Sequence, residues 1–224
     1  LFFFTRSAYN GAQRYAPIMW NGDQHTDWTV DYGIPTVLPA AFSLGFSGMT
    51  LSHADIGGFF SIGGIARDAE LLVRSMEVGA FSPLMRSHES IRPEANAQPY
   101  DENVVRHTVR LSQAHRTLAS YLQRVMEEAR EGVPAVRPDF YDINDFSKHG
   151  DAQSYFLGSD LYVCPVYQKG AGQRKVRLPE GKWIHLWSKQ PFSEGEHVVP
   201  APPGSPAVFY RANSTFAGLF ASIE

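Results

Sequence analysis

The sequence predicts an α/β region followed by an all-β region. Up to residue 132, short apolar runs of strand type alternate with longer segments whose apolar residues recur every three or four positions, as in parallel α/β arrays. Beyond that point, β-type runs follow one another at intervals of roughly ten residues and are separated by Gly and Pro, which is typical of an antiparallel β-sandwich. We therefore expect two domains, 1–132 and 133–224.

In the α/β region, strand and helix candidates alternate along the chain. The expected strands are Phe2–Phe4, which reads as fully buried, Met19–Trp20, Gly48–Leu51 and Ala80–Met85. The expected helices are Asp31–Ser47, Arg67–Val78 and Asn103–Glu131. Pro35 places the start of the first helix late, Gly79 ends the second, and Gly132 with Pro134 ends the third.

The all-β region consists of short β-type runs bounded by turn residues. They are Leu161–Val166, Lys175–Leu178, Trp183–Trp187, Val198–Pro200, Ala207–Arg211 and Thr215–Ser222. Their regular spacing predicts an antiparallel sandwich.

Composition limits the classes of partner. The 224 residues carry 20 Lys and Arg against 23 Asp and Glu, a formal net charge of -3, which argues against nucleic acid and anionic membranes. No stretch approaches the roughly 20 apolar residues of a membrane span. The single Cys164 lies in an apolar run and suits a reducing compartment, so we expect a cytoplasmic protein. The sequence leaves homo-oligomer formation open.

Chemically active side chains follow the strand candidates. In parallel α/β arrays, catalytic and binding groups gather just past the carboxyl ends of the strands. At any one such position, the residue is commonly an Asp that caps a helix or a His whose hydrogen bonds are made within its loop. Such residues recur at successive strand ends, however, and this favours a shared site. The residues in question are Arg6, Asp23, His53 with Asp55, and His88.

Asp23 is the strongest candidate for proton transfer. It lies between Trp20 and Trp28, whose rings offer an apolar wall or a platform for a sugar. Apolar surroundings disfavour the charged carboxylate, so we expect a raised pKa and a proton donor. Asp27 and Asp31 are rivals, although both lie nearer the following helix, where Asp is ordinarily a cap.

No metal site is expected. The candidate ligands His25, His53, Asp55 and His88 lack the helical His-x-x-x-His or Cys-x-x-Cys spacing that specifies a metal geometry.

The chain resembles glycoside hydrolase family 31 in motifs that occur in the same order along its length. The motifs are Arg6-Ser7, Trp20–Gln24, Ser52–Phe59, Met85–Glu89 and Leu178–Trp183. That family includes retaining α-glucosidases and α-xylosidases. Its sulfoquinovosidase branch, which cleaves α-glycosides of the sulfonated sugar sulfoquinovose, is the closer match at Gln24, Asp27-Trp28, Pro206–Arg211 and Thr215–Ile223.

The resemblance implies a role for each strand-end residue. Asp23 is the implied general acid/base, and Arg6 and His88 are implied to bind sugar hydroxyls. Asp55 is implied to shape the neighbouring loop, while the rings of Trp20 and Phe59 complete the expected substrate-binding set. The implied partner is a carbohydrate, an α-glycoside, and no cofactor enters the implied reaction.

The resemblance also implies the overall architecture. Residues 1–132 would be the C-terminal half of a (β/α)8 TIM barrel, strands five to eight, with Asn103–Glu131 as its last helix. The β-rich remainder would be the β-sandwich that packs behind the barrel. The whole chain would then be a fragment of a larger glycosidase.

Two departures from the family keep alternatives open. Retaining hydrolysis needs a second carboxylate about 5–5.5 Å from the acid/base. In this family it is an Asp at the end of the fourth barrel strand, which we expect before residue 1, so the isolated chain would be a non-catalytic carbohydrate-binding fragment. The branch also places a sulfonate-binding Tyr where this chain has Phe59. An α-glucosidase or α-xylosidase of the same family is therefore the alternative.

Overall fold

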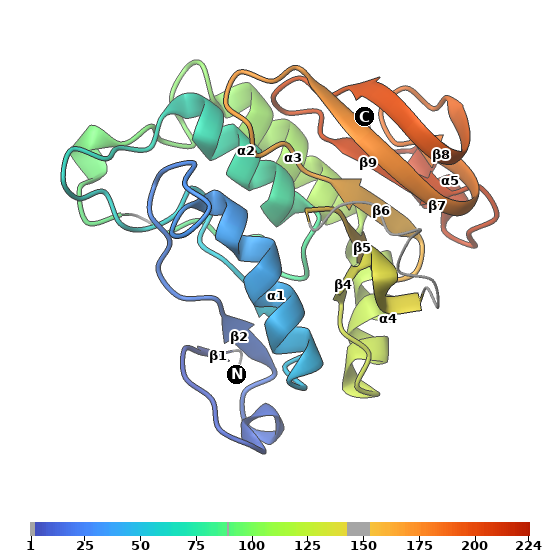
Figure 1. Cartoon of the computed structure of the whole chain (residues 1–224), viewed down its shortest axis with the longest axis horizontal. Helices are drawn as coiled ribbons and strands as arrows, with labels where there is room; N and C mark the ends of the chain where they lie inside the picture. The colour runs from blue at the N-terminus through green and yellow to red at the C-terminus, as the bar shows by residue number, and fades with distance from the viewer. Residues whose placement is uncertain (1–2, 89, 143–152) are drawn as a thin grey trace.

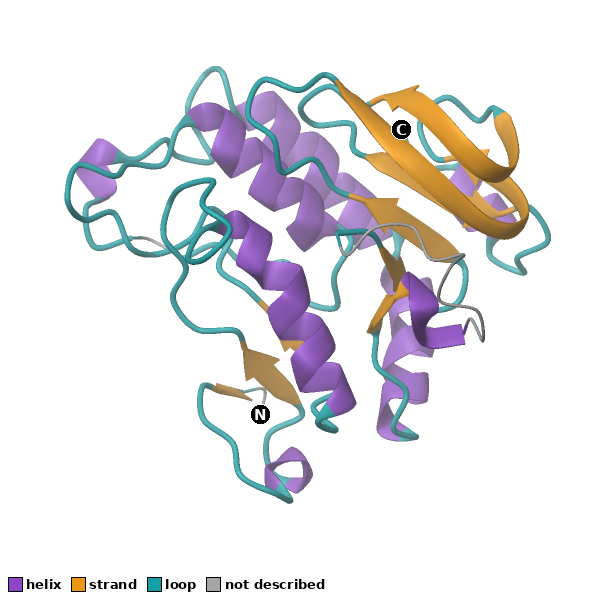
Figure 2. Ribbon diagram, viewed as in Figure 1, coloured by secondary structure: helices purple, strands orange, loops and turns teal. Residues whose placement is uncertain are grey.

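The computed structural model of the chain describes residues 3–88, 90–142 and 153–224. A parallel sheet lies in the first part of the chain and an antiparallel sheet in the second (Figure 1). Figure 2 shows the two sheets in separate places, with helices between them. The fold class expected from the sequence, α/β followed by all-β, is confirmed.

The parallel sheet has the order β1-β2-β3 and is formed by β1 (Phe4–Thr5), β2 (Ile18–Trp20) and β3 (Ser52–His53). Phe4 pairs with Ile18, and Trp20 pairs with His53. Within the described residues β1 has a neighbour on one side only, and Phe4 is 37% exposed. The prediction of a fully buried first strand is therefore wrong for its described residues, and Phe2 lies outside them.

Two other strand predictions need correction. The third strand begins at Ser52, later than the predicted Gly48–Leu51, because the ladder with β2 starts where Met19 N–H donates to Leu51 O. The predicted strand Ala80–Met85 does not form. Helix continues through Ala80, and Ser82 Oγ then donates to Gly79 O and Leu84 O in a turn. An isolated parallel bridge between Ile56 and Ser87 takes the place of a fourth strand.

Helices α1 (Val37–Phe46) and α2 (Ala69–Ala80) form where periodicity predicts them. Pro35 lies in a short 3-10 turn that leads into α1, which confirms the late start. Helix α2 is capped by Asp68, whose Oδ1 accepts the Leu71 N–H at 2.8 Å, and nearly all of its residues are buried. Helix α1 packs between β3 and the antiparallel sheet.

The predicted helix Asn103–Glu131 is two helices, α3 (Val105–Thr117) and α4 (Ala119–Arg130). Leu118 separates them with a ψ of 0°. Just before it, Thr117 Oγ1 donates to Gln113 O at 2.9 Å, a bond to the carbonyl one turn back that bends helices. The remaining helical turns are Ala12–Arg14, Ile34–Thr36, Pro93–Ala95 and Asp139–Asp142.

The antiparallel sheet has the order β4-β5-β6-β9-β7-β8. Its strands are β4 (Val136–Pro138), β5 (Tyr155–Leu157), β6 (Leu161–Cys164), β7 (Gln173–His185), β8 (Pro191–Pro200) and β9 (Ala207–Arg211). The predicted run Lys175–Leu178 and residues 183–185 of the predicted run Trp183–Trp187 belong to the single strand β7, with a register shift between Leu178 and Lys182. Leu186 and Trp187 lie in the turn that follows. The first half of β7 pairs only with β8, and its Val176 packs with Cys164 and Phe209 from β6 and β9 in one apolar cluster.

The predicted last strand, Thr215–Ser222, is instead a short helix, α5 (Ala217–Ala221). Phe220 on α5 is fully buried, with its ring centroid 5.0 Å from that of Tyr121 and 5.4 Å from that of Tyr210. A larger apolar core joins all four long helices to one face of the antiparallel sheet, through residues such as Leu38, Leu72, Leu111, Leu122 and Val208.

Candidate active site

The candidate site forms where the parallel strands end. Because β1, β2 and β3 run in parallel and in register, the residues that follow them meet at one edge of the sheet. Arg6 follows β1 directly, Asp23 follows β2 after a turn, and Asp55 follows β3. His53, which the sequence places after a strand, is the last residue of β3 and is buried.

Arg6 and Asp23 form an ion pair at this edge. The guanidinium Nη2 of Arg6 lies 3.2 Å from Oδ2 of Asp23, and its Cζ lies 5.2 Å from the ring centroid of Trp20. The side chain of Arg6 is 63% exposed, whereas that of Asp23 is 11% exposed. The carboxylate of Asp23 is therefore shielded but accessible, beside an arginine with donors left for a ligand.

A second cluster, Arg86 with His53 and Asp55, lies beside the first. Arg86 Nε donates to His53 Nε2 at 3.0 Å, and its Nη2 makes a close ion pair with Asp55 Oδ1. The guanidinium Cζ of Arg86 also lies 5.0 Å from the ring centroid of Phe4 and 6.0 Å from that of Trp20. One arginine thus contacts residues from all three strands and the loop after β3.

Burial governs the ionisation of this second cluster. Burial, with a smaller contribution from the positive charge of Arg86, lowers the pKa of His53 to about 4, so the imidazole is neutral and can accept the Arg86 bond. Burial raises the pKa of Asp55, and the neighbouring Asp23 adds to this. Arg86, His88 and the indole of Trp20 act to lower the pKa of Asp55. Neither Trp20 Nε1 nor Asp55 Oδ2 forms a hydrogen bond of good geometry with the described residues.

The remaining two predicted site residues, Phe59 and His88, contact each other. Their ring centroids are 5.1 Å apart, in an edge-on arrangement. The side chain of His88 is exposed, and its charge acts on Asp55. The structure therefore brings together all the predicted residues, although Asp55 itself is buried against Arg86.

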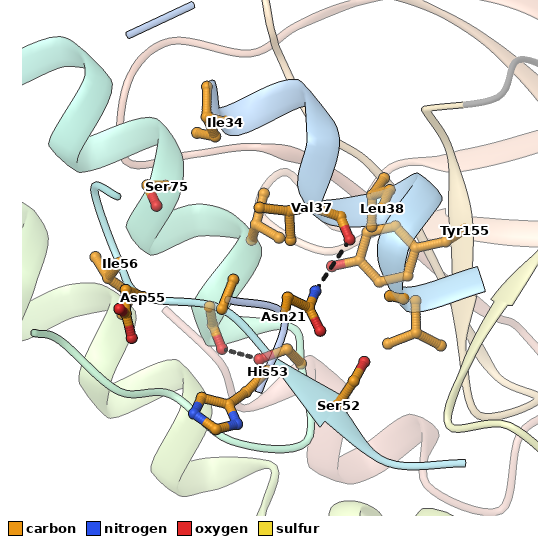
Figure 3. Close-up of a pocket in the computed structure, with 16 residues that line it drawn as sticks. Asn21, Ile34, Val37, Leu38, Ser52, His53, Asp55, Ile56, Ser75 and Tyr155 are labelled. Carbon is orange, nitrogen blue, oxygen red and sulfur yellow. Dashed lines mark hydrogen bonds between the residues drawn. The ribbon is translucent and has the colours of Figure 1, made fainter. Parts of the chain in front are cut away.

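An apolar cavity lies behind the site, on the helix side of β3. It is lined by α1, α2 and β5 residues, among them Leu38, Val78 and Tyr155. Figure 3 shows Asn21 at its wall, where its Nδ2 donates to Val37 O at 3.2 Å, and the His53 ring extending away from α1. His53 and Asp55 also line this cavity, so the buried part of the site borders it.

The rivals of Asp23 have different roles. Asp27 Oδ1 accepts hydrogen bonds from the Thr29 N–H at 2.9 Å and from Thr29 Oγ1 at 2.7 Å, and its Oδ2 lies 3.6 Å from His25 Nδ1. This is a turn that Asp27 stabilises, rather than the helix cap that the sequence suggests. Asp31 is exposed in the same loop.

Arg86 is the residue at the candidate site that sequence reasoning did not single out. It stands in the motif Met85–Glu89, of which Glu89 lies outside the described residues, and that motif is the signal that could have found it. Its partners His53 and Asp55 lie more than thirty positions earlier in the chain, so spacing alone could not reveal the contacts.

Membrane-spanning helices and metal-ligand clusters are both absent from the described residues. No helix there is long and apolar enough to cross a membrane. Likewise, in residues 3–88, 90–142 and 153–224, no three His, Cys, Asp or Glu side chains group as metal ligands would.

Comparison with protein families explains the arrangement. Residues 1–123 match the family model described as the glycosyl hydrolases family 31 TIM-barrel domain, and residues 132–216 match the family 31 C-terminal domain. The chain belongs to glycoside hydrolase family 31. The parallel sheet with its helices is part of the family 31 barrel, and the antiparallel sheet is the family's C-terminal domain.

Known members of family 31 resemble the chain over its full length. It is 40% identical to the sulfoquinovosidase of Escherichia coli over 227 residues, covering 100% of this chain and 34% of that protein. Identity to the sulfoquinovosidase of Agrobacterium fabrum is also 40%, over 99% of this chain and 34% of that protein. The chain therefore spans about a third of the length of these relatives.

Solved structures give the same result. A family 31 sulfoquinovosidase from E. rectale, in complex with an aza-sugar inhibitor, superposes with a TM-score of 0.92 at 35% identity, covering 100% of this chain and 34% of that one. A family 31 α-xylosidase from a soil metagenome, complexed with xylose, gives a TM-score of 0.83 at 28% identity over 97% of this chain and 35% of that one.

Proposed function

We propose that this chain carries the general acid/base of a retaining α-glycosidase that hydrolyses α-glycosides of sulfoquinovose. One observation carries the proposal: the strand ends of a family 31 barrel bring Asp23 into contact with Arg6, beside Trp20. The assignment to sulfoquinovose rests on 40% identity over the whole chain to two sulfoquinovosidases.

The proposed reaction proceeds by two displacements. Asp23 protonates the glycosidic oxygen while a second carboxylate attacks the anomeric carbon and forms a glycosyl-enzyme. Asp23 then removes a proton from water, which releases the sugar with its α configuration retained. Arg6 can hold hydroxyls with paired donors, and His88 adds a donor at the exposed side of the site.

The second carboxylate is proposed to come from outside these 224 residues. Retaining geometry requires it about 5–5.5 Å from Asp23. Asp55 is the nearby carboxylate of this chain, but it is buried and engaged by Arg86. For the isolated chain, the proposed function is therefore carbohydrate binding without turnover.

A second candidate substrate is a neutral α-glucoside or α-xyloside. It is favoured by Phe59, which contacts His88 without offering a hydroxyl to a sulfonate. The α-glucosidase 2 of Bacillus thermoamyloliquefaciens, a relative of this type, is 29% identical over 96% of this chain and 27% of that protein.

The remaining expectations stay proposals. The near balance of charge supports a carbohydrate rather than nucleic acid or a membrane as partner. The single Cys164, which is buried in an apolar strand, supports a cytoplasmic location. We also propose the division of the chain into domains at 1–132 and 133–224, and the sequence leaves homo-oligomer formation open.

The test uses a chimera in which residues 1–224 replace the matching segment of the E. coli sulfoquinovosidase. We expect this chimera to hydrolyse aryl α-sulfoquinovosides. Asp23→Asn should lower kcat/KM about 10²–10⁴-fold for poor leaving groups, such as alkyl alcohols, which need a proton as they depart. It should lower kcat/KM far less for activated aryl groups.

The matched control is Asp31→Asn, which removes a carboxylate from the exposed loop of the same segment and should leave both rates within about twofold, as surface substitutions do. Equal loss for both classes of leaving group with Asp23→Asn would contradict the acid/base assignment. A folded chimera without hydrolysis of any α-glycoside would contradict the proposed function itself.

A further inference from the structure

Arg86 makes more contacts with the site than any role assigned to it so far explains. Its guanidinium donates to His53 at the end of β3 and pairs with Asp55 in the loop that follows. The same group lies against the rings of Phe4 on β1 and Trp20 on β2. Its side chain is 23% exposed, so these contacts are shielded from water.

The backbone around Arg86 is tied to the same loop. Ile56 N–H donates to Arg86 O at 3.1 Å, and Ile56 forms a parallel bridge with Ser87. The loop that begins at Asp55 ends at Phe59, and the segment of Arg86 ends at His88, whose ring meets that of Phe59. Any shift of Arg86 relative to Asp55 would therefore move the two rings that face each other across the site.

The buried charge of Asp55 makes its pairing with Arg86 important for the loop. The side chain of Asp55 has no exposed surface, and a buried carboxylate without a counter-charge is costly. The charged groups that face it are Arg86 and His88 from one segment and Asp23 from the end of β2. His53 is neutral, so it accepts a bond from Arg86 without competing for its charge.

We propose that Arg86 is a positioning residue, which fixes Asp55 and the loop to Phe59 against its own segment and so sets His88 and Phe59 relative to Asp23. This rests on the proposed glycosidase function, because the groups so placed are the ones that would hold the sugar. Arg86 itself acts through these residues and not on the reacting atoms.

The experiment compares Arg86→Met and Arg86→Lys with a matched control, Arg124→Met, in the chimera described above. Arg124 lies on α4, where it forms an exposed ion pair with Glu128. We expect Arg86→Met to lower kcat/KM about 100-fold, as displacements of about 1 Å do. Arg86→Lys should recover part of the loss, since it keeps the charge but lacks the planar fork that reaches two partners. The control should stay within about twofold, because exposed ion pairs contribute little.

The pH profile separates positioning from general stability. Without Arg86, the main charge that opposes the effect of burial on Asp55 is gone, so the pKa of Asp55 should rise further. The acid limb of kcat/KM should then move to higher pH in Arg86→Met and less so in Arg86→Lys. A loss of folding alone would lower the amount of active enzyme without moving this limb.

Crystal structures of the chimera and its Arg86→Met and Arg86→Lys variants give a readout that does not depend on activity. The Asp55 carboxylate and the His88 ring should shift by about 1 Å with Met and less with Lys. Unchanged positions of both groups would overturn this inference, whether or not the chimera is active. Absence of activity from the chimera with Arg86 intact would instead reject the proposed function.

Discussion

At the scale of single residues, the site is a set of side chains whose protonation is controlled by burial. His53 shows this most clearly, because the residue is only 3% exposed and its Nε2 accepts a hydrogen bond from Arg86. Asp55 is buried beside it and is held by the same arginine. The site therefore combines a sealed inner layer, His53 with Asp55, and an accessible outer layer, Arg6 with His88.

His53 should make folding stability depend on pH. Its pKa is lowered to about 4 in the folded chain, whereas the unfolded side chain titrates near 6.5. Between these values the unfolded state binds more protons, so the stabilisation is complete above pH 6.5 and is lost as the pH falls towards 4. The full difference is about 3 kcal/mol. We expect His53→Gln to reduce the pH dependence of the thermal unfolding midpoint of the chimera over this range. The side-chain carbonyl of Gln can still accept a hydrogen bond from Arg86.

The control for this prediction is His197→Gln on β8, where the imidazole is half-buried and lies against Phe192. It should leave the pH dependence of the midpoint as it was. A His53→Gln chimera that loses stability on acidification as steeply as its parent would contradict the assignment.

Phe59 should determine the preference between sulfonated and neutral sugars. We expect Phe59→Tyr to raise the ratio of kcat/KM for aryl α-sulfoquinovoside over aryl α-glucoside about tenfold or more, because hydrogen bonds to charged groups contribute about 1.5–3 kcal/mol. Phe60→Tyr is the matched control, since its ring lies between Phe59 and His25, whereas the ring of Phe59 is the one that meets His88. A preference for the neutral sugar that Phe59→Tyr leaves unchanged would favour the α-glucosidase alternative.

At the scale of elements, the sequence predicts helices better than short strands. Helix α2 follows from its pattern because residues such as Leu71, Leu72 and Val78 are buried on adjacent turns. Helix α5 does not follow from its pattern, because only five residues are helical and what fixes them is the packing of Phe220 on Tyr121, almost a hundred positions away. The contacts between Arg86 and β3 escape sequence reasoning for the same reason, whereas Asp23 could be singled out because it closely follows β2 along the chain.

Helix α2 also carries a buried ion pair that links it to the loops of the antiparallel domain. Arg74 Nη1 lies 3.2 Å from Glu77, and its Nη2 donates to Ala171 O at 2.6 Å and to Ala201 O at 3.0 Å. Glu77 Oε1 accepts the Gly204 N–H at 2.7 Å. Both side chains are at most 1% exposed. The pair thus orients loops that lie about a hundred residues further along the chain.

Removing one partner of the Arg74–Glu77 pair should lower the free energy of unfolding more than replacing both partners. Glu77→Ala leaves the charge of Arg74 buried and unpaired, for which we expect a loss of about 3–5 kcal/mol in the free energy of unfolding. The double variant Arg74→Met with Glu77→Leu should lose much less, because apolar side chains of similar volume avoid the cost of burying charge. Denaturant unfolding of the chimera measures both. A double variant that is less stable than Glu77→Ala would show that the hydrogen bonds to the loops, rather than the charges, dominate.

At the scale of the whole molecule, one core spans the two regions of the chain. Tyr155 on β5 donates to Phe81 O at the end of α2 at 2.8 Å, and Tyr121 on α4 donates to Leu157 O at 2.6 Å. The parallel sheet, by contrast, has an open edge. Within the described residues β1 pairs with β2 alone, and Phe3 is 46% exposed. A parallel sheet is ordinarily covered or closed into a barrel, so this edge is where the rest of a barrel would pair.

The isolated chain should therefore bind sugars without hydrolysing them, and a complementing polypeptide should restore turnover. We expect no hydrolysis of aryl α-sulfoquinovoside or aryl α-glucoside by residues 1–224 alone, because Asp55, the carboxylate described next to Asp23, is buried and held by Arg86. Co-expression with the E. coli sulfoquinovosidase that lacks the matching segment should give activity, because pairing at β1 would close the sheet and bring that carboxylate opposite Asp23. The same mixture with Asp23→Asn should stay inactive on substrates with poor leaving groups. Clear turnover by residues 1–224 alone would show that the chain supplies its own nucleophile.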